Sequence, residues 1–435
     1  MNFFKPKLFT SLKSYNKKQL LNDVIAGIIV AIIALPLSIA LAIASGAEPV
    51  QGLYTAIVAG FVISFFGGSL VNISGPTAAF ATIVAGIIAT QGFDGLIIAT
   101  IMAGIILIVF GLCRVGNLIK FIPTTITVGF TAGIAVTIVI GQLKDFFGMS
   151  FGGASPVEAV EKIEALIHNI TTFNPVGFLV GAFALAILIF WPKVSKKIPG
   201  SLIVVILGAL VVALFDLNVM TIGDLYTINS GFPRFNIPAF SFEKVIALIP
   251  NAFTIAILAA IESLLSCVVS DKMINDKHNS NTELVAQGLG NIASGLFGGI
   301  PATGAIARTS ANVKNGGRTP VSGIVHAIVL LLVLVLLMPL ASFIPMPIIA
   351  AVLLMVAYNM CEYKHFIHIC KTAPKTDVIV LVVTFVLTIV FDLVVAIAIG
   401  LGVALIFYLI KRAKNKKAQA TEKEIPEEII EEFIK

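Results

Sequence analysis

A short segment of small and polar residues, Gly298–Ser310 (GGIPATGAIARTS), lies between stretches apolar enough to cross a lipid bilayer. Gly298, Gly299 and Pro301 interrupt the backbone there, and we expect a new short helix over Ala302–Thr309. A helix that begins inside a membrane leaves its first N–H groups without partners, which is tolerated only where the break is buried in protein or lines a watery cavity. The segment therefore predicts an interior site, and the positive end of such a helix favours an anion.

The same pattern occurs once earlier, at Gly67–Phe80 (GGSLVNISGPTAAF). A Gly-Gly break is followed by a short extended stretch, then by Gly-Pro-Thr and small residues that can start a helix. Two broken segments at corresponding places in two halves of a chain are the best sequence indication of a transporter's binding site. We therefore expect two half-helices whose N-terminal ends face one substrate.

Composition places the chain in a membrane. Hydrophobic residues make up 58% and charged residues 12% of 435 residues, and the mean hydropathy is +1.04, whereas soluble domains are about 45–50% apolar and about 25% charged. The net charge of +6 comes from short basic clusters between apolar stretches, so it predicts topology and not nucleic-acid binding. The four cysteines show no metal-ligand spacing, and no HExxH, GxSxG or Walker motif occurs, which argues against an enzyme.

Apolar stretches of sufficient length predict fourteen spans, with both ends of the chain in the cytoplasm. The first half contains 23–45, 50–67, 75–91, 95–112, 121–143, 175–191 and 200–216. The second half contains 245–270, 283–297, 302–313, 320–339, 345–360, 376–391 and 392–411. This topology puts 24 of the 29 basic residues on the cytoplasmic side and 4 outside, with Arg308 left inside a span, as the positive-inside rule requires.

Each half has seven spans, an odd number, so a duplication would give the halves opposite orientations. The expected fold is an all-α integral membrane protein with a 7+7 inverted repeat and broken half-helices in segments 3 and 10. The chain then divides into a cytoplasmic N-terminal segment (1–22), a first repeat (23–216), an extracellular connector (217–244), a second repeat (245–411) and a cytoplasmic tail (412–435). We expect it in the cell's inner (plasma) membrane.

Glu262 is a carboxylate well inside the predicted span 245–270. A charge at mid-bilayer costs about 2.5–3.5 kcal/mol on insertion scales and usually faces a cavity or a partner. We interpret Glu262 as the site of a coupling cation, H⁺ or Na⁺, with Ser266 one turn away and Gly304 beside it. Glu262 and Ser266 would be metal ligands only if the ion is Na⁺. The alternative is a structural carboxylate that is hydrogen-bonded to nearby backbone.

Arg308 lies about two turns after the small-residue start of its span. As a cation near the midplane it would attract anions or balance Glu262, whereas the alternative is that it snorkels to the cytoplasmic edge near Lys314. His326 is interpreted as a packed, hydrogen-bonded histidine, and Asp23 as a charge at a helix start. The expected substrate-binding residues lie at the two half-helix starts: Ser74, Gly75, Thr77, Ala78, Ala79, Thr303, Gly304, Ala305 and Arg308.

Four motifs, in order along the chain, resemble signatures of the SulP family, the bacterial sulfate-permease-like anion transporters that are counterparts of mammalian solute-carrier family 26. They are Asp23–Gly60, Gly67–Phe80, IESLLSCVVSD at 261–271, and GGIPATGAIARTSANVKNGGRTPVSGIVHA at 298–327. The resemblance extends from Asp23 to about Arg412. The run ALPLSIALAIASGAEPVQGLY is particularly similar to the bicarbonate symporter branch.

The resemblance implies that a core domain (spans 1–4 and 8–11) carries a small anion past a gate domain (spans 5–7 and 12–14), in elevator-type alternating access. It implies bicarbonate, sulfate or a dicarboxylate as substrate, no cofactor beyond H⁺ or Na⁺ as coupling ion, and a homodimer. Members usually carry a cytoplasmic STAS domain after the last span, and this sequence stops about where that domain would begin.

Departures from the family pattern bear on the coupling ion. Sodium-coupled bicarbonate relatives have Asp at the position of Glu262, Thr at that of Ser266 and Thr at that of Ile306. Because Na⁺ needs several hard oxygen ligands, the departures favour H⁺. Two alternatives stay open: an uncoupled anion channel or exchanger, and a nucleobase permease of the same architecture. A nucleobase site would want a second carboxylate near span 302–313, where none occurs.

Overall fold

The computed structural model describes residues 4–116, 124–153, 156–195, 198–228 and 230–390, together with 399, 400, 402, 403 and 406. Within these residues, eight helices are long and apolar enough to cross a membrane. Contacts divide the chain into a larger unit, Met1–Phe121 with Ile134–Met360, and a smaller one, Ile122–Gly133 with Cys361–Lys435. The predicted tail 412–435 and most of the predicted span 392–411 lie outside the described residues.

The elements follow one another in this order. The first half contains α1 (Lys7–Ser11), η1 (Leu12–Ser14), α2 (Lys17–Ala44), α3 (Pro49–Phe66), β1 (Ser74–Gly75), η2 (Ala78–Phe80), α4 (Ala81–Leu112), α5 (Thr124–Phe146), α6 (Ala159–His168), η4 (Ile170–Thr172), α7 (Pro175–Val194) and α8 (Gly200–Leu214). The second half contains α9 (Ile222–Leu225), α10 (Phe242–Ile274), α11 (Ser280–Leu296), β2 (Thr303–Gly304), α12 (Ile306–Lys314), α13 (Val321–Leu337), η5 (Met338–Phe343), α14 (Met346–Cys361), α15 (Tyr363–Thr372) and α16 (Lys375–Val390).

Local chemistry explains several helix boundaries. α3 begins at Pro49, whose ring presets the first helical residue, and Glu48 and Gln51 form a capping box around it. α7 begins where the side chain of Asn174 accepts hydrogen bonds from two backbone N–H groups of the first turn. The predicted spans 75–91 and 95–112 are continuous in α4 except at Gly92, whose φ of 71° breaks the helix and is accessible to glycine.

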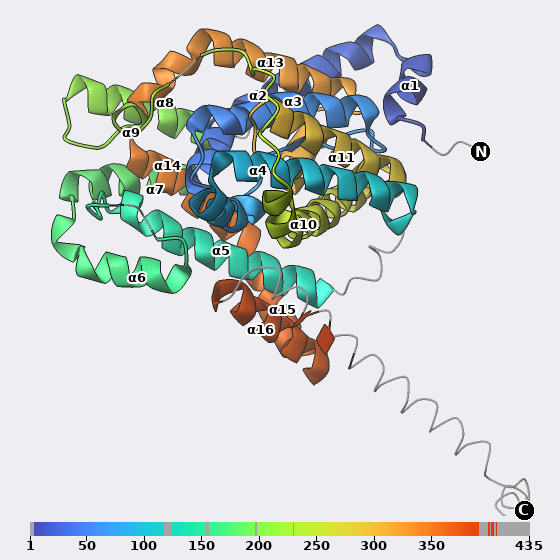
Figure 1. Ribbon diagram of the computed structural model, residues 1–435. Helices are drawn as coiled ribbons and strands as arrows, with labels where there is room; N and C mark the ends of the chain where they lie inside the picture. Colours follow the sequence, from blue (N-terminus) through green and yellow to red (C-terminus); the bar gives the residue numbers. More distant parts are fainter. Residues whose placement is uncertain are drawn as a thin grey trace, which may run out of the picture. The chain divides into compact units, whose positions relative to one another are not determined.

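Six helices of the larger unit, α2, α3, α4, α10, α11 and α13, pack against one another in a bundle (Figure 1). α4 and α11 approach to backbone contact at Gly104 and Gly288. A Cβ atom on Gly104 would lie 2.6 Å from the Gly288 carbonyl oxygen, and a Cβ on Gly288 would meet the Gly104 carbonyl oxygen in the same way. Only glycine fits at either position without a shift of the backbone, so the two helices pack backbone against backbone here.

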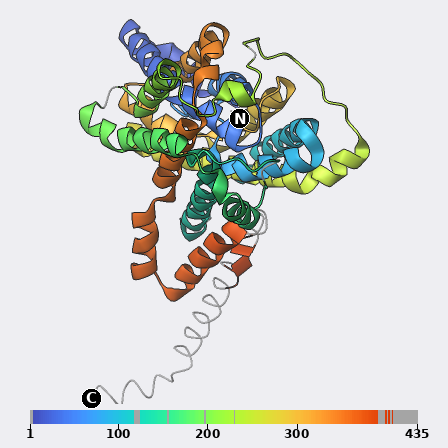
Figure 2. The ribbon, with the colours of Figure 1, turned by 90° about the vertical axis from the view of Figure 1, so that its left-hand side faces the viewer.

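The rest of the larger unit packs outside this bundle. Phe146, Leu188, Val204 and Ile348 belong to a second apolar cluster, which joins the end of α5 to α7, α8 and α14. Tyr226–Ser241 connects α9 to α10 without a helix or strand in its described residues, and Figure 2 shows it as a long loop. In its described residues, the predicted connector 217–244 therefore contains the short helix α9 and the first turn of α10 as its only helical parts.

The smaller unit has a core of its own. Val128, Ile369 and Leu381 form its buried cluster. Phe366 packs against Phe385, with ring centroids 5.2 Å apart, and so holds α15 to α16. α15 lies between the predicted spans 345–360 and 376–391 and was not predicted.

The prediction that Asp23 is a helix-start charge is wrong. α2 begins at Lys17, and Asp23 lies inside it, fully buried. Its carboxylate accepts hydrogen bonds from the Tyr15 hydroxyl at 2.9 Å, the Thr319 hydroxyl at 2.6 Å and the Arg318 backbone N–H at 2.8 Å. Asp23 therefore joins the N-terminal segment to the turn before α13.

Candidate functional site

The two broken segments meet through a pair of two-residue strands. β1 pairs with β2 in antiparallel fashion, with Ser74 opposite Gly304 and Gly75 opposite Thr303. All four residues are buried. The backbone N–H of Ala305 extends the contact by donating to the Ile73 carbonyl oxygen at 2.9 Å. Residues that are more than two hundred positions apart in the chain thus form one element.

Each strand leads directly to a helix start. After β1, Thr77 is extended and precedes η2, which continues into α4. After β2, Ala305 is the N-cap of α12. The first N–H groups of a helix have no carbonyl partner in that helix, and its N-terminal end carries a partial positive charge. The strand pair therefore brings two sets of open donors and two positive helix ends into one region.

The predicted start of the second half-helix is wrong by about one turn. The helix begins at Ile306 and not at Ala302, because Thr303 and Gly304 are extended and bonded to β1. Thr303, which was expected at a half-helix start, therefore lies in β2 instead. Thr77 does lie at the start of the first half-helix, as the N-cap of η2, but its side chain makes no capping hydrogen bond.

α10 passes directly beside β2. The hydroxyl oxygens of Ser263 and Thr303 lie 2.6 Å apart, and the Gly304 N–H donates to the Ser263 hydroxyl at 2.9 Å. The Thr303 hydroxyl also donates to the Ala259 carbonyl oxygen at 3.1 Å. The Thr303 hydroxyl is thus engaged with α10.

Glu262 and Arg308 lie near the start of the first half-helix. Glu262 is half-buried on α10, near the side chain of Thr77 and the charge of Arg308. Arg308 is only 1% exposed, so the snorkelling alternative is wrong. Its Nη2 donates to the carbonyl oxygen of Pro76, next to Thr77. Among the described residues, its Nε and Nη1 have no hydrogen-bond partner.

Ser266 lies in a different environment from Glu262. It is fully buried, and its hydroxyl lies 2.8 Å from Asn72 Oδ1 and 3.0 Å from Thr309 Oγ1. No hydrogen bond joins it to Glu262 in the described part of the chain. The described residues also contain no cluster of three or more His, Cys, Asp or Glu side chains that could hold a metal ion. An ion site shared by Glu262 and Ser266 stays a prediction.

Polar residues on one face of α11 hold both strand segments, and they were not predicted as site residues. Glu283, Gln287 and Asn291 recur every four residues and so share a face. Gln287 Nε2 donates to the Ser74 hydroxyl at 2.9 Å. Asn291 exchanges two hydrogen bonds with the backbone of Ala302, at 2.8 and 2.9 Å. The signal that would have found them is this polar stripe inside an otherwise apolar span.

His326 on α13 is fully buried, as predicted for a packed histidine. The prediction that it is hydrogen-bonded is wrong within the described residues, where neither ring nitrogen has a partner.

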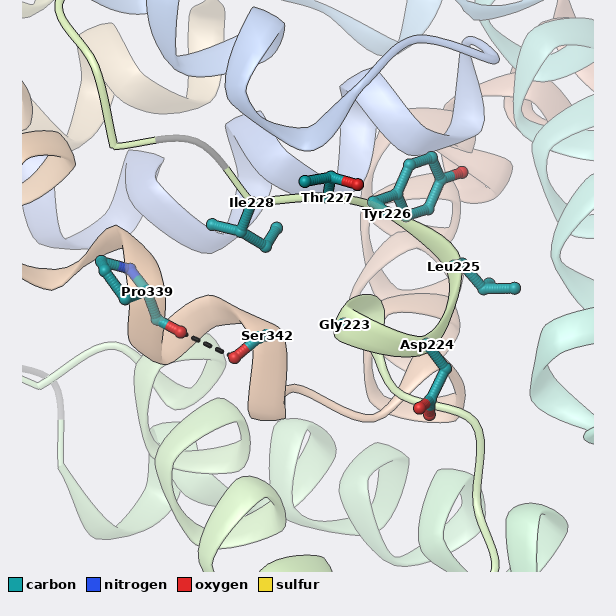
Figure 3. Close-up of a pocket in the computed structure, with 8 residues that line it drawn as sticks. All are labelled: Gly223, Asp224, Leu225, Tyr226, Thr227, Ile228, Pro339 and Ser342. Carbon is teal, nitrogen blue, oxygen red and sulfur yellow. Dashed lines mark hydrogen bonds between the residues drawn. The ribbon is translucent and has the colours of Figure 1, made fainter.

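A separate cavity of about 510 Å³ opens at the connector of the larger unit (Figure 3). It is lined by Gly223, Asp224, Leu225, Tyr226, Thr227, Ile228, Pro339 and Ser342. Hydrogen bonds from the backbone and side chain of Thr221 hold the pKa of Asp224 below its ordinary value. None of the predicted anion-site residues lines this cavity.

Comparison with known proteins gives consistent matches. The model of the Sulfate permease family matches residues 20–384. YvdB of Bacillus subtilis (strain 168), provisionally named a sulfate transporter, is 44% identical over 382 residues, which cover 86% of this chain and 70% of YvdB. The bicarbonate transporter BicA of Picosynechococcus is 34% identical over 369 residues, which cover 82% of this chain and 65% of BicA. The chain therefore spans about two thirds of the length of these relatives.

Solved structures support the same fold. The transmembrane domain of a cyanobacterium bicarbonate transporter BicA matches with a TM-score of 0.80 at 32% identity, covering 88% of this chain and 98% of that one. The murine Slc26a9 anion transporter in the inward-facing state matches with a TM-score of 0.85, covering 93% of this chain and 71% of that one. At 18% identity the second match concerns the fold alone. The predicted all-α membrane fold is confirmed.

Proposed function

Because the chain belongs to the sulfate permease family, we propose that it moves a small anion across a membrane and binds it where the two broken segments meet. The observation that carries the proposal is the burial of the Arg308 guanidinium beside Pro76, in the turn between β1 and η2. A buried cation and two helix N-terminal ends together attract negative charge. The relatives' names supply sulfate and bicarbonate as the substrate class, to which we add dicarboxylates.

Backbone donors are the proposed ligands of the anion. The N–H groups at Ala78, Ala79 and the first turn of α12 point away from their own helices' carbonyl groups, as all first-turn donors do. Ser74, Gly75, Thr303 and Gly304 place these two helix starts through the strand pair. Ala79 and Ala305 have small side chains, so a larger residue at either position would block the approach of an anion to the backbone.

Glu262 is the proposed site of the coupling cation. Its carboxyl group lies by Thr77 and near Arg308, so binding H⁺ or Na⁺ there cancels a negative charge close to the anion. The neutralised Glu262 then leaves the Arg308 charge to attract the anion. Because the Ser266 hydroxyl is bonded to Asn72 and Thr309, fewer oxygen ligands remain for Na⁺, and we favour H⁺.

The wider arrangement is proposed with the same function. It includes an elevator motion of a core domain against a gate domain and a homodimer, for which the family is the support. It also includes a plasma-membrane location with both termini in the cytoplasm, which the 24-to-4 distribution of basic residues supports.

Uptake into liposomes tests the proposal. The purified protein is reconstituted, and uptake of labelled bicarbonate, sulfate, chloride and a dicarboxylate is measured with a pH gradient, with a Na⁺ gradient and with neither. We expect accumulation of at least one of these anions driven by one gradient. Flux that ignores both gradients favours an uncoupled channel or exchanger, and no flux above empty liposomes for any anion overturns the proposal.

Ala305→Leu tests the location of the site. Leucine fills the space in front of α12, so we expect the apparent affinity for the transported anion to fall. Ala186→Leu on the exposed face of α7 is the matched control, because the same atoms are added away from the site. Normal anion affinity in correctly folded Ala305→Leu protein removes this helix start from the mechanism.

A further inference from the structure

Glu283 is a carboxylate buried to 1% exposure on α11. None of the ion pairs between described residues involves it. Its Oε2 accepts from the backbone N–H groups of Gly68 at 2.9 Å and Ser69 at 3.2 Å. Its Oε1 accepts from Asn72 Nδ2 at 2.8 Å and Gln287 Nε2 at 3.0 Å. All four partners are N–H donors, so this environment fits an acceptor-only group.

Two of these donors belong to the break that precedes β1. Gly68 and Ser69 follow the end of α3, where their N–H groups have no helical partner. The chain passes so close to α11 that a Cβ on Gly68 would strike the Asn279 carbonyl oxygen and lie 2.8 Å from the Glu283 backbone nitrogen. Glu283 therefore fixes the path of the chain into β1.

Asn72 connects Glu283 by hydrogen bonds to two further helices. Its Nδ2 is committed to Glu283, which leaves Oδ1 to accept from the hydroxyl groups of Ser266 on α10 and Thr309 on α12, at 2.8 and 3.0 Å. Thr309 Oγ1 in turn accepts the Ile73 N–H at 3.0 Å. The Asn72 amide thus joins the segment before β1 to α11, α10 and α12.

Gln287 forms a second series of hydrogen bonds from Glu283. The Nε2 that donates to Glu283 also donates to the Ser74 hydroxyl in β1. The bonds of Asn72 thus reach α12 and the residue before β1, and the bond of Gln287 reaches β1 itself. Neither set includes Glu262, Thr77 or Arg308.

From this geometry we infer that Glu283 is a positioning residue of the transport site. Its carboxylate fixes Asn72 and Gln287, and these set the separation of β1 and β2 and thereby of the two half-helix starts. The inference rests on the proposed function, because it assigns the purpose of that geometry to anion binding.

Glu283→Gln is the test variant because it keeps the shape and changes the hydrogen bonding. The amide has one oxygen, so it satisfies one pair of donors and presents its own NH₂ to the other pair. The double variant Glu283→Gln with Asn72→Asp restores a donor–acceptor match between the two positions. Gln287 can adapt to it, because its Oε1 has no partner among the described residues. Glu164→Gln on the exposed surface of α6 is the control.

Two measurements are made on each purified protein: hydrogen–deuterium exchange without anion, and binding of the labelled anions. We expect Glu283→Gln to speed exchange in 67–76 and 303–309 while the rest of the bundle keeps its protection. We also expect anion affinity to fall by about tenfold to a hundredfold, the range for a hydrogen bond to a charged group. We expect the double variant to recover most of the protection from exchange and most of the anion affinity. The control variant should change neither quantity.

Unchanged exchange in the two segments overturns the inference, and so does a uniform increase over all helices, which assigns Glu283 to general stability. If wild-type protein binds none of the anions, the proposed function fails while the exchange data still decide whether Glu283 positions the strands. If Glu283→Gln does not fold, Gln287→Met removes one donor and the bond to Ser74, and it must give the same local pattern with a smaller effect.

Discussion

Ser263 and Thr303 lie with their hydroxyl oxygens 2.6 Å apart, which joins α10 to β2 in the buried interior of the larger unit. Ser263 directly follows Glu262, and Thr303 pairs with Gly75 of β1. The proposed cation site and the strand pair at the proposed anion site are therefore separated by one hydrogen bond. The two proposed sites are thus connected by a short path of buried residues.

Thr303→Val removes this bond while keeping the shape of the side chain. The Ser263 hydroxyl then loses a partner, and we expect the free energy of unfolding to fall by about 1–3 kcal/mol. The melting temperature of the purified protein reports the change. Thr100→Val is the control, because Thr100 is equally buried but donates only to Leu96 of its own helix, at 2.7 Å. Equal losses of stability in the two variants would show that the contact with Ser263 does not contribute to the free energy of unfolding.

Glu262→Gln should abolish gradient-driven accumulation and leave anion binding at least partly intact. The amide keeps the size of the side chain but cannot take up and release a proton or neutralise a cation. Accumulation under a pH or Na⁺ gradient is compared with anion exchange at equilibrium in the same liposomes. Glu243→Gln, in the exposed first turn of α10, is the control. Undiminished accumulation by Glu262→Gln removes this residue from coupling.

Arg308→Ala should weaken the binding of divalent anions more than that of monovalent ones. At an effective dielectric constant of about 20, two unit charges about 8 Å apart interact by about 2 kcal/mol, and a doubly charged anion loses about twice as much. Selectivity between sulfate and bicarbonate should shift by about one to two orders of magnitude.

The control for this prediction is Lys314→Ala, which removes an exposed cation at the end of the same helix. Apparent affinities for both anions are measured in all three proteins. An equal loss for both anions in Arg308→Ala, or no loss, contradicts the electrostatic role.

Tyr15→Phe should alter how stability depends on alkaline pH. Burial, together with the hydrogen bond to Asp23, raises the pKa of Tyr15 from 10.0 to about 12. Because the folded-state pKa is the higher one, the protonated phenol stabilises the folded protein fully below about pH 10, and this stability is lost as the pH rises to about 12. The variant should melt at a lower temperature near neutral pH and decline less steeply above pH 10.

Melting temperatures across this pH range check the prediction, with Tyr363→Phe on α15 as the exposed control. A wild-type decline above pH 10 that persists unchanged in Tyr15→Phe rules out the Tyr15–Asp23 contact as its source.

Hydropathy and backbone-breaking residues were enough to predict most of the long helices. The predicted span 50–67 corresponds to α3, Pro49–Phe66, because a proline and a glycine mark its two ends. The first half-helix start was found from its Gly-Pro and small-residue pattern, whereas the second was placed about one turn too early. These are local properties, which can be determined from a short stretch of sequence.

The strand pair and its supports could not be predicted in the same way. Pairing of Ser74 with Gly304 depends on two segments far apart in the chain, and no local pattern reports it. Glu262 and Ser266 are one turn apart, yet Ser266 bonds to Asn72 and Thr309, because the neighbours of each side chain are set by packing. The polar face of α11 was overlooked because hydropathy averaged along a span conceals three buried side chains on one side of it.

The contact between Gly104 and Gly288 has a mechanical consequence. Neither helix can slide along the other without driving a carbonyl oxygen into the facing Cα, so shear between α4 and α11 is blocked. We therefore expect α4, which continues from the first half-helix start, and α11, whose polar face holds both strands, to move together. If access to the proposed site changes, we therefore expect the change to occur at the contacts that this pair of helices makes with other elements, and not between α4 and α11 themselves.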